Sequence, residues 1–212
     1  MNTLLMDTSS SNMLVCLNAS GNLIEGQKFD TSKHLETLMP SIEELLSKKD
    51  FSVQNIDYLG VVVGPGSFTG IRIAVSTAKA MMMVNKKIKA VAVNSLELMA
   101  KSYLKNNDFS KTIMCVIPTT IKKVYYAKFN IDNRLCEDGI CEVEKIKEIA
   151  GDCQVVSNKE IVDGAIVYNV TNKDLNTYVE EKILSKDFAD KLSPQYIGLS
   201  QAEEQLKMKE NK

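Results

Sequence analysis

The stretch from Gly64 to Gly70 has residue types that could bind a phosphate group. It reads Gly-Pro-Gly-Ser-Phe-Thr-Gly, follows an apolar run over 58–63 and precedes a helical pattern over 71–84. Backbone N–H groups at the start of a helix bind phosphate in this arrangement. However, the spacing has one residue too many for the dinucleotide fingerprint, and Ile71 stands where a Walker A loop has lysine. We therefore favour a structural role, in which the glycines let the helix begin close to the sheet.

Asp7 is the acidic residue that could assist such a phosphate site, since it ends the first apolar run of the chain. Mg²⁺ in proteins usually rests on one or two carboxylates together with substrate phosphates. The second half of the sequence offers no matching acid-and-glycine loop, and Asp7 begins an Asp-Thr-Ser-Ser cluster that is typical of a turn. We interpret it as a turn residue and expect no metal site. A vestigial phosphate loop would comprise Asp7, Thr8, Gly64, Gly66, Ser67 and Gly70.

His34 is the only histidine, which limits the catalytic and metal chemistry that this sequence could support. The five cysteines include no Cys-x-x-Cys pair, so the usual zinc ligand sets cannot be assembled. The sequence contains no Gly-x-Ser-x-Gly motif, and no group that would orient the imidazole can be identified. We interpret His34 as an interface or capping residue, and the cysteines as the reduced thiols of a cytoplasmic protein.

The overall composition argues against binding to nucleic acid by charge alone and against insertion in a membrane. The 212 residues carry 26 basic and 27 acidic side chains, and only two of the basic residues are arginine. A protein that reads nucleic acid by itself usually contains clustered arginine. Apolar runs are shorter than the roughly 20 residues of a membrane helix, and Asp7 interrupts the first run too early for a signal peptide. We expect a cytoplasmic globular protein.

Hydrophobic periodicity predicts an α/β arrangement for the first half of the chain. Apolar runs between turn residues predict three strands in an antiparallel meander before residue 30. Two buried strands follow, over 58–63 and 88–93. Helices are expected over 32–46, 71–84 and 95–104, the first with Ser32 as its cap.

The polar stretch over 105–111 is the best domain boundary. We therefore expect two units, 1–104 and 105–212, with the last helix packing back on the first unit. The second unit repeats the α/β pattern more weakly. Strands are expected near 112–117, 122–130, 153–157 and 165–168, and helices near 142–150, 173–186 and 199–210.

The helix expected over 71–84 carries more apolar surface than one sheet can cover. At about 100° per residue, Arg72, Ser76 and Lys79 form one narrow polar stripe. The small and apolar remainder spans roughly 220°, whereas a helix on one sheet needs little more than about 100°. The surplus face must be buried either inside its own domain or against another protein, and the pattern leaves both alternatives open.

The segment Gly64–Ala74 also resembles the signature of the TsaB (YeaZ) family. Pro194-Gln195-Tyr196, with Ala202-Glu203 after it, resembles the end of the family pattern, while Pro118-Thr119-Thr120 departs from it. The resemblance is strong over residues 1–100 and thin after about 127. Four further segments match in order: Leu5–Ser9, His34–Ile42, Val93–Glu97 and Val124–Ala127.

The resemblance implies an actin-like, sugar-kinase-like (ribonuclease H-like) α/β fold with two subdomains, each with a mixed sheet. It also implies that the chain is the non-catalytic partner of TsaD, which transfers the threonylcarbamoyl group to the adenosine next to the tRNA anticodon. The ATPase TsaE would join the assembly, tRNA would be contacted only through the complex, and the chain alone would form a homodimer. The chain alone would bind no cofactor, while ATP or ADP at the complex interface is left open.

In this family the helices that match 34–47 and 70–84 dock onto TsaD, and the same surface serves self-pairing. The resemblance thus implies a set of partner-binding residues: His34, Leu38, Ile42, Arg72, Ile73, Ala74, Thr77, Ala80 and Met81. Two other functions stay open. One is a small-molecule kinase or ATPase of the actin-like superfamily that uses Asp7 and the 64–70 loop. The other is a homodimeric regulator unrelated to tRNA.

Overall fold

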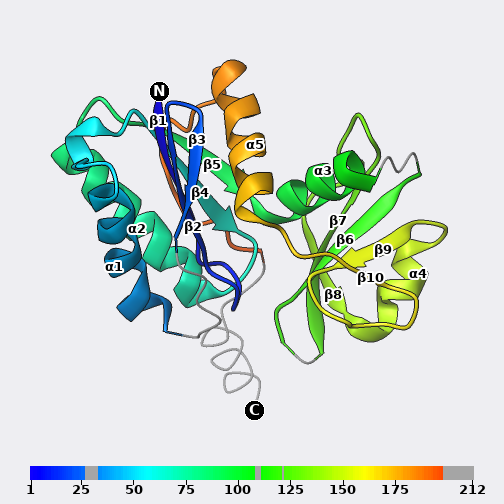
Figure 1. Cartoon of the computed structure of the whole chain (residues 1–212). Helices are drawn as coiled ribbons and strands as arrows, with labels where there is room; N and C mark the ends of the chain where they lie inside the picture. Colours follow the sequence, from blue (N-terminus) through cyan, green and yellow to red (C-terminus); the bar gives the residue numbers. More distant parts are fainter. Residues whose placement is uncertain (27–32, 108–110, 121, 198–212) are drawn as a thin grey trace, which may run out of the picture.

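The computed structural model describes residues 1–26, 33–107, 111–120 and 122–197, which form two five-stranded sheets (Figure 1). The first sheet contains β1 (Asn2–Asp7), β2 (Leu14–Ala19), β3 (Asn22–Glu25), β4 (Tyr58–Gly64) and β5 (Lys89–Asn94). The second contains β6 (Ile113–Pro118), β7 (Lys123–Phe129), β8 (Gly139–Glu142), β9 (Gln154–Ser157) and β10 (Ile166–Val167).

The two sheets repeat one topology. The first has the order β3-β2-β1-β4-β5, and the second has the equivalent order β8-β7-β6-β9-β10. In the first sheet, β1, β2 and β3 pair antiparallel, while β1, β4 and β5 pair parallel. The second sheet repeats both patterns, with β6 in the place of β1. The predicted class, two α/β halves that each hold a mixed sheet, is therefore confirmed, and so is the antiparallel meander.

Five α-helices and two short 3₁₀ turns occur among the described residues. They are α1 (His34–Ser47), α2 (Phe68–Val84), α3 (Ser95–Asn107), α4 (Ile146–Ala150), α5 (Asn172–Leu184), η1 (Val53–Asn55) and η2 (Val143–Lys145). The predicted cap Ser32 and the helix expected over 199–210 lie outside the described residues. The sequence did not predict β8, because its four residues, Gly-Ile-Cys-Glu, show no alternation of apolar and polar types, although their exposure alternates in the structure.

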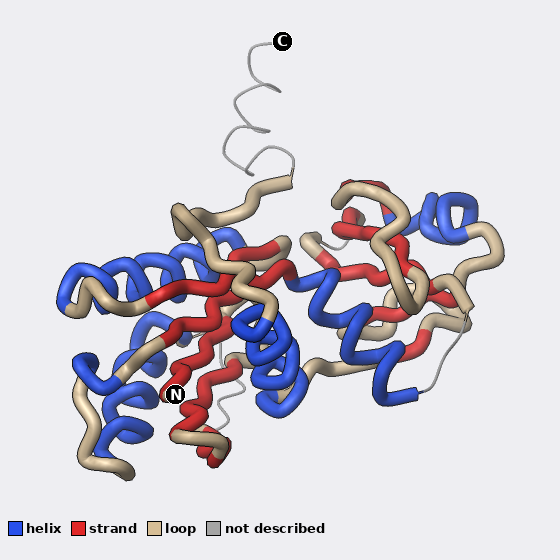
Figure 2. Tube along the Cα trace, turned by 90° about the horizontal axis from the view of Figure 1, so that it is seen from above, coloured by secondary structure: helices blue, strands red, loops and turns tan. Residues whose placement is uncertain are grey.

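Alternate side chains of the first sheet enter two separate cores, as strand geometry requires. One core contains Leu4, Val15 and Val61 together with the apolar faces of α1 and α2. The other contains Leu5, Cys16 and Val62 on the opposite face of the same strands. Figure 2 shows helices on both sides of this sheet. Among the described residues, no helix is both long enough and apolar enough to cross a membrane.

The helix α5 packs on the first sheet, although it follows the second sheet in the chain. Its residues Leu175, Val179 and Ile183 belong to the same core as Leu5 and Val62. In turn, α3 packs Met99 and Tyr103 against the second sheet. The helix that follows the last strand of each half, α3 after β5 and α5 after β10, thus packs on the sheet of the other half. The expected units 1–104 and 105–212 separate the two sheets, but residues 172–184 pack with the first one. The sequence could not predict this, because an apolar stripe on a helix shows which face is buried but not which sheet covers it.

Gly60, inside β4, provides a test of how α5 packs. A Cβ atom at this position would lie 2.6 Å from Cγ2 of Val179 and 2.8 Å from Cδ2 of Leu5. We expect Gly60→Ala to lower the free energy of unfolding by about 1–3 kcal/mol, because the added methyl group overfills the core. Val179→Ala should reduce this effect, since it removes two of the clashing methyl groups. Urea denaturation of the wild type, the two single variants and the double variant measures how far the two stability effects depend on each other. Strictly additive effects would contradict the position of α5.

Candidate functional site

The glycine-rich loop after β4 holds the start of α2 against the turn that follows β1. The Ser67 N–H donates a hydrogen bond of 2.6 Å to the carbonyl oxygen of Ser9. The Thr8 hydroxyl donates one of 2.6 Å to the carbonyl oxygen of Gly70. The Ser67 side chain caps α2 by accepting from the Gly70 N–H. These bonds explain why the helix begins at Phe68, three residues earlier than the apolar pattern predicts.

Two glycines of this loop are needed because the two backbone segments touch. A Cβ atom at position 70 would lie 1.9 Å from the Thr8 carbonyl oxygen, and one at position 66 would lie 2.5 Å from that of Ser9. Backbone oxygens thus stand where a phosphate would approach the loop, and one of them already accepts from Ser67. All six residues of the predicted vestigial phosphate loop lie in this region, but the contacts among them are those of a packing unit. The geometry favours the structural interpretation of the glycines.

Asp7 ends β1 and is almost fully buried. Its Oδ1 accepts a 2.7 Å hydrogen bond from the Ser9 N–H, which is the turn role expected from the sequence. Burial raises the pKa of this carboxyl group, while the hydrogen bonds from Ser9 and the charge of His34 act in the opposite direction. The net result is a carboxyl group that is protonated more readily in the folded chain than in water.

A cavity between the two halves begins at Asp7. Residues of both halves line it, among them Ser95 from the first and Asn158 from the second. Its volume is about 40 Å³, which suits a few water molecules. Sites for cofactor-sized ligands usually measure about 300–1,000 Å³. In this arrangement of the halves, the cavity is too small for a nucleotide.

His34 begins α1 and lies inside the protein, so the structure contradicts its prediction as an interface residue. Its Nε2 is 2.6 Å from the carbonyl oxygen of Ser10. The imidazole therefore joins α1 to the same turn that contacts α2. The sequence could not identify this partner, because Ser10 is 24 residues away from His34.

Four other predicted partner-binding residues, Leu38, Ile42, Ala74 and Met81, are also buried in this chain's own core. In this structure they leave at most 5% of their surface to solvent, which contradicts their assignment to a partner contact. The apolar periodicity that marks a docking helix is the same one that marks the face on its own sheet. The remaining predicted residues reach the surface: Arg72 and Ala80 are exposed, and Ile73 and Thr77 are partly exposed.

The exposed apolar residues of these helices are different ones. Leu35 is 76% exposed and Met39 is 53% exposed on α1, while Met83 is 72% exposed on α2. The two helices contact each other on one side of the first sheet (Figure 1). We call the outer surface of the two helices the docking face; its exposed and partly exposed members are Leu35, Met39, Arg72, Ile73, Thr77, Ala80, Met83 and Val84. Both helices begin at the same end of the sheet, so Leu35 and Met39 lie near one end of this surface and Met83 and Val84 near the other. Leu35 and Met39 could have been found from their four-residue spacing, which continues the apolar stripe beyond its buried centre.

At the start of α2, Arg72 lies in a cluster with two aromatic rings. Its Cζ is 3.8 Å from the ring centroid of Phe68, and its Nε donates a 2.7 Å hydrogen bond to the Tyr196 hydroxyl. The two rings are 4.7 Å apart. Because the Gln195 N–H also donates to the Val63 carbonyl oxygen, the structure brings together the two ends of the sequence pattern, Gly64–Ala74 and Pro194–Tyr196.

The chain is similar to known proteins over most of its length. Residues 29–205 match the family model described as TsaD, tRNA N6-adenosine threonylcarbamoyltransferase. A tRNA threonylcarbamoyladenosine biosynthesis protein TsaB from Buchnera aphidicola of Acyrthosiphon pisum is 28% identical over 73% of this chain and 77% of its own. The TsaB of Escherichia coli is 25% identical over 70% and 62%, respectively. The TsaB of Bacillus subtilis is 30% identical over 65% and 58%.

Two solved structures share the fold. One, described as an uncharacterized protein with similarity to peptidase YEAZ from Pseudomonas aeruginosa, has a TM-score of 0.77 and 16% identity, and covers 93% of this chain and 99% of its own. YeaZ from Pseudomonas aeruginosa has a TM-score of 0.74 and 18% identity, with coverage of 92% and 99%.

Gly70→Ala tests the backbone contact that places α2. We expect it to lower the free energy of unfolding by about 3 kcal/mol or more, because the Thr8 carbonyl oxygen that the new Cβ meets is backbone and cannot rotate away. The matched control is Thr69→Ala, an exposed position in the same helical turn, which should change stability by no more than about 0.5 kcal/mol. Urea denaturation measures both. Equal stability of the two variants would mean that the two segments do not touch.

Asp7→Asn tests the buried carboxyl group. The amide oxygen can still accept from the Ser9 N–H, while the buried charge is removed. Since the folded pKa is raised above the ordinary value of 3.8, the folded state binds more protons, and stability falls as the pH rises through this range. We expect the variant to be more stable than the wild type at pH near 7. Urea denaturation at several pH values should show this difference disappear toward a pH of about 4. A variant that is less stable than the wild type at neutral pH would contradict the raised pKa of Asp7.

Proposed function

The chain belongs to the TsaD family and, within it, to the TsaB (YeaZ) proteins, and on this basis we propose that it acts in tRNA threonylcarbamoyladenosine biosynthesis as a non-catalytic partner subunit of TsaD. In this role the chain enables threonylcarbamoyl transfer to the adenosine next to the tRNA anticodon without touching the reacting atoms. TsaE joins the same assembly, and tRNA is contacted only through the complex.

The docking face is the observation that carries this proposal. Leu35, Met39 and Met83 are large apolar side chains that are more than half exposed on two adjoining helices. Leu35 and Met39 lie near the start of α1 and Met83 near the end of α2, so they mark the two ends of one helical surface. Large exposed apolar groups are common where another protein binds. Methionine favours such contacts because its flexible side chain adapts to the shape of a partner. Most of the apolar surface of α2, including Ile71, Val75 and Met81, is buried in the chain's own core, and we propose that the exposed remainder contacts another protein.

Charges give the docking face an orientation. The exposed residues of α2 include Arg72 and Lys79, whereas the exposed residues of α1 include Glu36 and Glu43. A partner helix must present the opposite signs in the same order, since facing like charges are costly. A second copy of this chain satisfies this condition when its α1 faces α2 of the first copy. The same face therefore supports a homodimer when the chain is alone and a heterodimer with TsaD when both are present.

The loop and the cavity support a non-catalytic role. The Ser67 N–H is bonded to Ser9, and Asp7 is engaged in its own turn. The cavity beside Asp7 has room for only a few waters. We therefore propose that this chain alone binds no nucleotide and that any ATP or ADP in the complex lies at the interface with TsaD.

The direct test is reconstitution of the tRNA modification. Purified TsaD, TsaE and unmodified tRNA are supplied with the threonylcarbamoyl donor, with and without this chain, and the modified adenosine is quantified after digestion. We expect formation of the modified base to depend on the chain, while the chain alone neither modifies tRNA nor hydrolyses ATP. Turnover of ATP by the isolated chain, lost in Asp7→Ala, would favour the kinase alternative. Full modification without the chain would favour a regulator.

Leu35→Asp and Met39→Asp test the docking face. The fold should survive, because both side chains already lie in water. Binding to TsaD should weaken at least about tenfold, since a carboxylate in an apolar contact loses its hydration. Calorimetric titration with TsaD measures the affinity, and circular dichroism the fold. The matched control is Val167→Asp, an equally exposed apolar position on β10 of the other half, which should bind normally. Normal affinity of both α1 variants for TsaD would show that the docking face does not bind it.

A further inference from the structure

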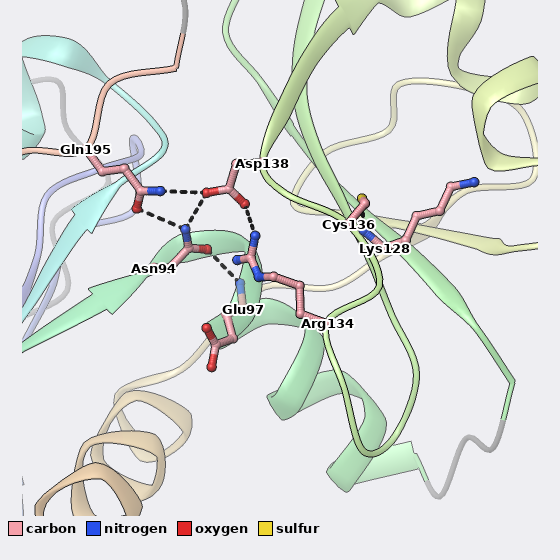
Figure 3. A network of polar contacts seen from close by, with 7 residues as sticks. All are labelled: Asn94, Glu97, Lys128, Arg134, Cys136, Asp138 and Gln195. Atoms are coloured by element: carbon pink, nitrogen blue, oxygen red, sulfur yellow. Dashed lines mark hydrogen bonds and ion pairs between the residues drawn. The ribbon is translucent and has the colours of Figure 1, made fainter. Parts of the chain in front are cut away.

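A network of polar side chains connects the two halves at the carboxyl ends of β4 and β5 (Figure 3). At its centre is Asp138, from the loop between β7 and β8 of the second half. Its Oδ2 accepts hydrogen bonds of 2.6 Å from Nδ2 of Asn94 and 2.8 Å from Nε2 of Gln195. Its Oδ1 accepts from Nη1 of Arg134 at 2.5 Å. We call these four residues, Asn94, Arg134, Asp138 and Gln195, the Asp138 latch.

Each partner in the latch is held in place by a second interaction. Asn94 ends β5, and its Oδ1 accepts a 2.9 Å bond from the Glu97 N–H at the start of α3. The backbone of Gln195 pairs with Val63 at the end of β4. The loop that carries Asp138 is closed by a 3.2 Å contact from the Lys128 N–H to Sγ of Cys136. The groups that meet are therefore presented by fixed segments, so little conformational entropy is lost on their contact.

The carboxylate of Asp138 is withdrawn from water, with its side chain only 5% exposed. Arg134 balances its charge from within the same loop, and this leaves Oδ2 for the two donors of the other half. Hydrogen bonds to an ionised acceptor are stronger than neutral ones, and a dry environment strengthens them further. If the halves moved apart, both bonds across the boundary would break together. The contact thus behaves as a single cooperative lock.

The position of the latch relates it to the cavity between the two halves. The chain passes from the first sheet to the second through α3 and returns between β10 and α5, so the halves are already connected there. The cavity between the halves is lined by residues on both sides of this connection, including Ser95 beside Asn94. Without the latch, the two halves could open about α3 and widen the cavity. With the latch formed, the cavity keeps the size of a few waters.

We propose that the Asp138 latch fixes the two halves in one closed arrangement, so that the chain works as a rigid body rather than as a hinge that opens and closes on a ligand. The contact is made by the protein's own side chains, close to the cavity that residues of both halves line. Because Gln195 directly precedes Tyr196, which contacts Arg72 of the docking face, the latch also fixes the position of the second half relative to α2. This inference does not depend on the identity of the docking partner.

Hydrogen exchange followed by mass spectrometry on the full chain tests the latch. In Asp138→Ala, amides of the segments that line the cavity, near 9–14, 95–99 and 169–170, should exchange about tenfold faster or more, since two bonds to a charged acceptor are lost. Amides of α1 and of the buried face of α2 should keep their protection. The matched control is Glu137→Ala, which removes the neighbouring exposed carboxylate of the same loop and should exchange like the wild type.

A second variant separates opening of the halves from damage to the loop. Asn94→Ser keeps a side-chain oxygen that can accept from the Glu97 N–H but has no amide to donate to Asp138. It should accelerate hydrogen exchange in the same cavity segments as Asp138→Ala does. The double variant should exchange little faster than either single variant. Unchanged exchange in both variants would overturn the proposal. Faster exchange spread equally over α1, α2 and the cavity would also overturn it, because this would reflect a general loss of stability.

Discussion

The contact between the turn after β1 and the first turn of α2 is the constraint on which the first half of the molecule depends. Carbonyl oxygens of Thr8 and Ser9 occupy the places where Cβ atoms at positions 70 and 66 would lie. Because only glycine fits at these positions, α2 begins directly on the sheet, with its direction fixed. This placement buries one arc of α2 on β4 and leaves the opposite arc in solvent. The same contact uses the Ser67 N–H, so a loop with the look of a nucleotide site serves to position a helix.

The rest of the architecture divides two tasks between two copies of one topology. The first copy carries α1 and α2 and therefore the docking face, whereas the second carries only the short α4 among its own described crossover elements. The exchange of α3 and α5 between the sheets joins the copies through apolar cores, which give stability but little directional precision. Hydrogen bonds supply the directional part, since they hold at one distance and one angle; they include those of Asp138 and those from Asn106 to Tyr168 and Asp174. In the arrangement that we propose, the second half keeps its position relative to the docking face when that face binds a partner.

Particular residues show how far sequence reasoning reached. The class of fold and most strands and helices were predicted correctly, because periods of 2 and 3.6 residues report local structure directly, but β8 was missed and α2 begins three residues before its predicted start. The turn role of Asp7 and the structural role of the glycines were also derived from local residue chemistry. Among the predicted docking residues, Arg72 and Ala80 are exposed and stay a prediction, whereas His34, Leu38, Ile42, Ala74 and Met81 are buried. The pattern selected the centre of each apolar stripe, which a helix places on its own sheet, and passed over Leu35 and Met39 at its margin.

The sequence by itself determined most of the elements and their order, the need for glycine near the start of α2 and the resemblance to the TsaB family. Tertiary structure alone decided which apolar side chains face solvent, which sheet α5 covers, and which distant polar groups meet. Asn94 and Asp138 are 44 residues apart, and Arg72 and Tyr196 are 124 apart. The reason is physical: periodicity states that one face of an element must leave water, whereas the partner that covers it is fixed by the packing of the whole chain.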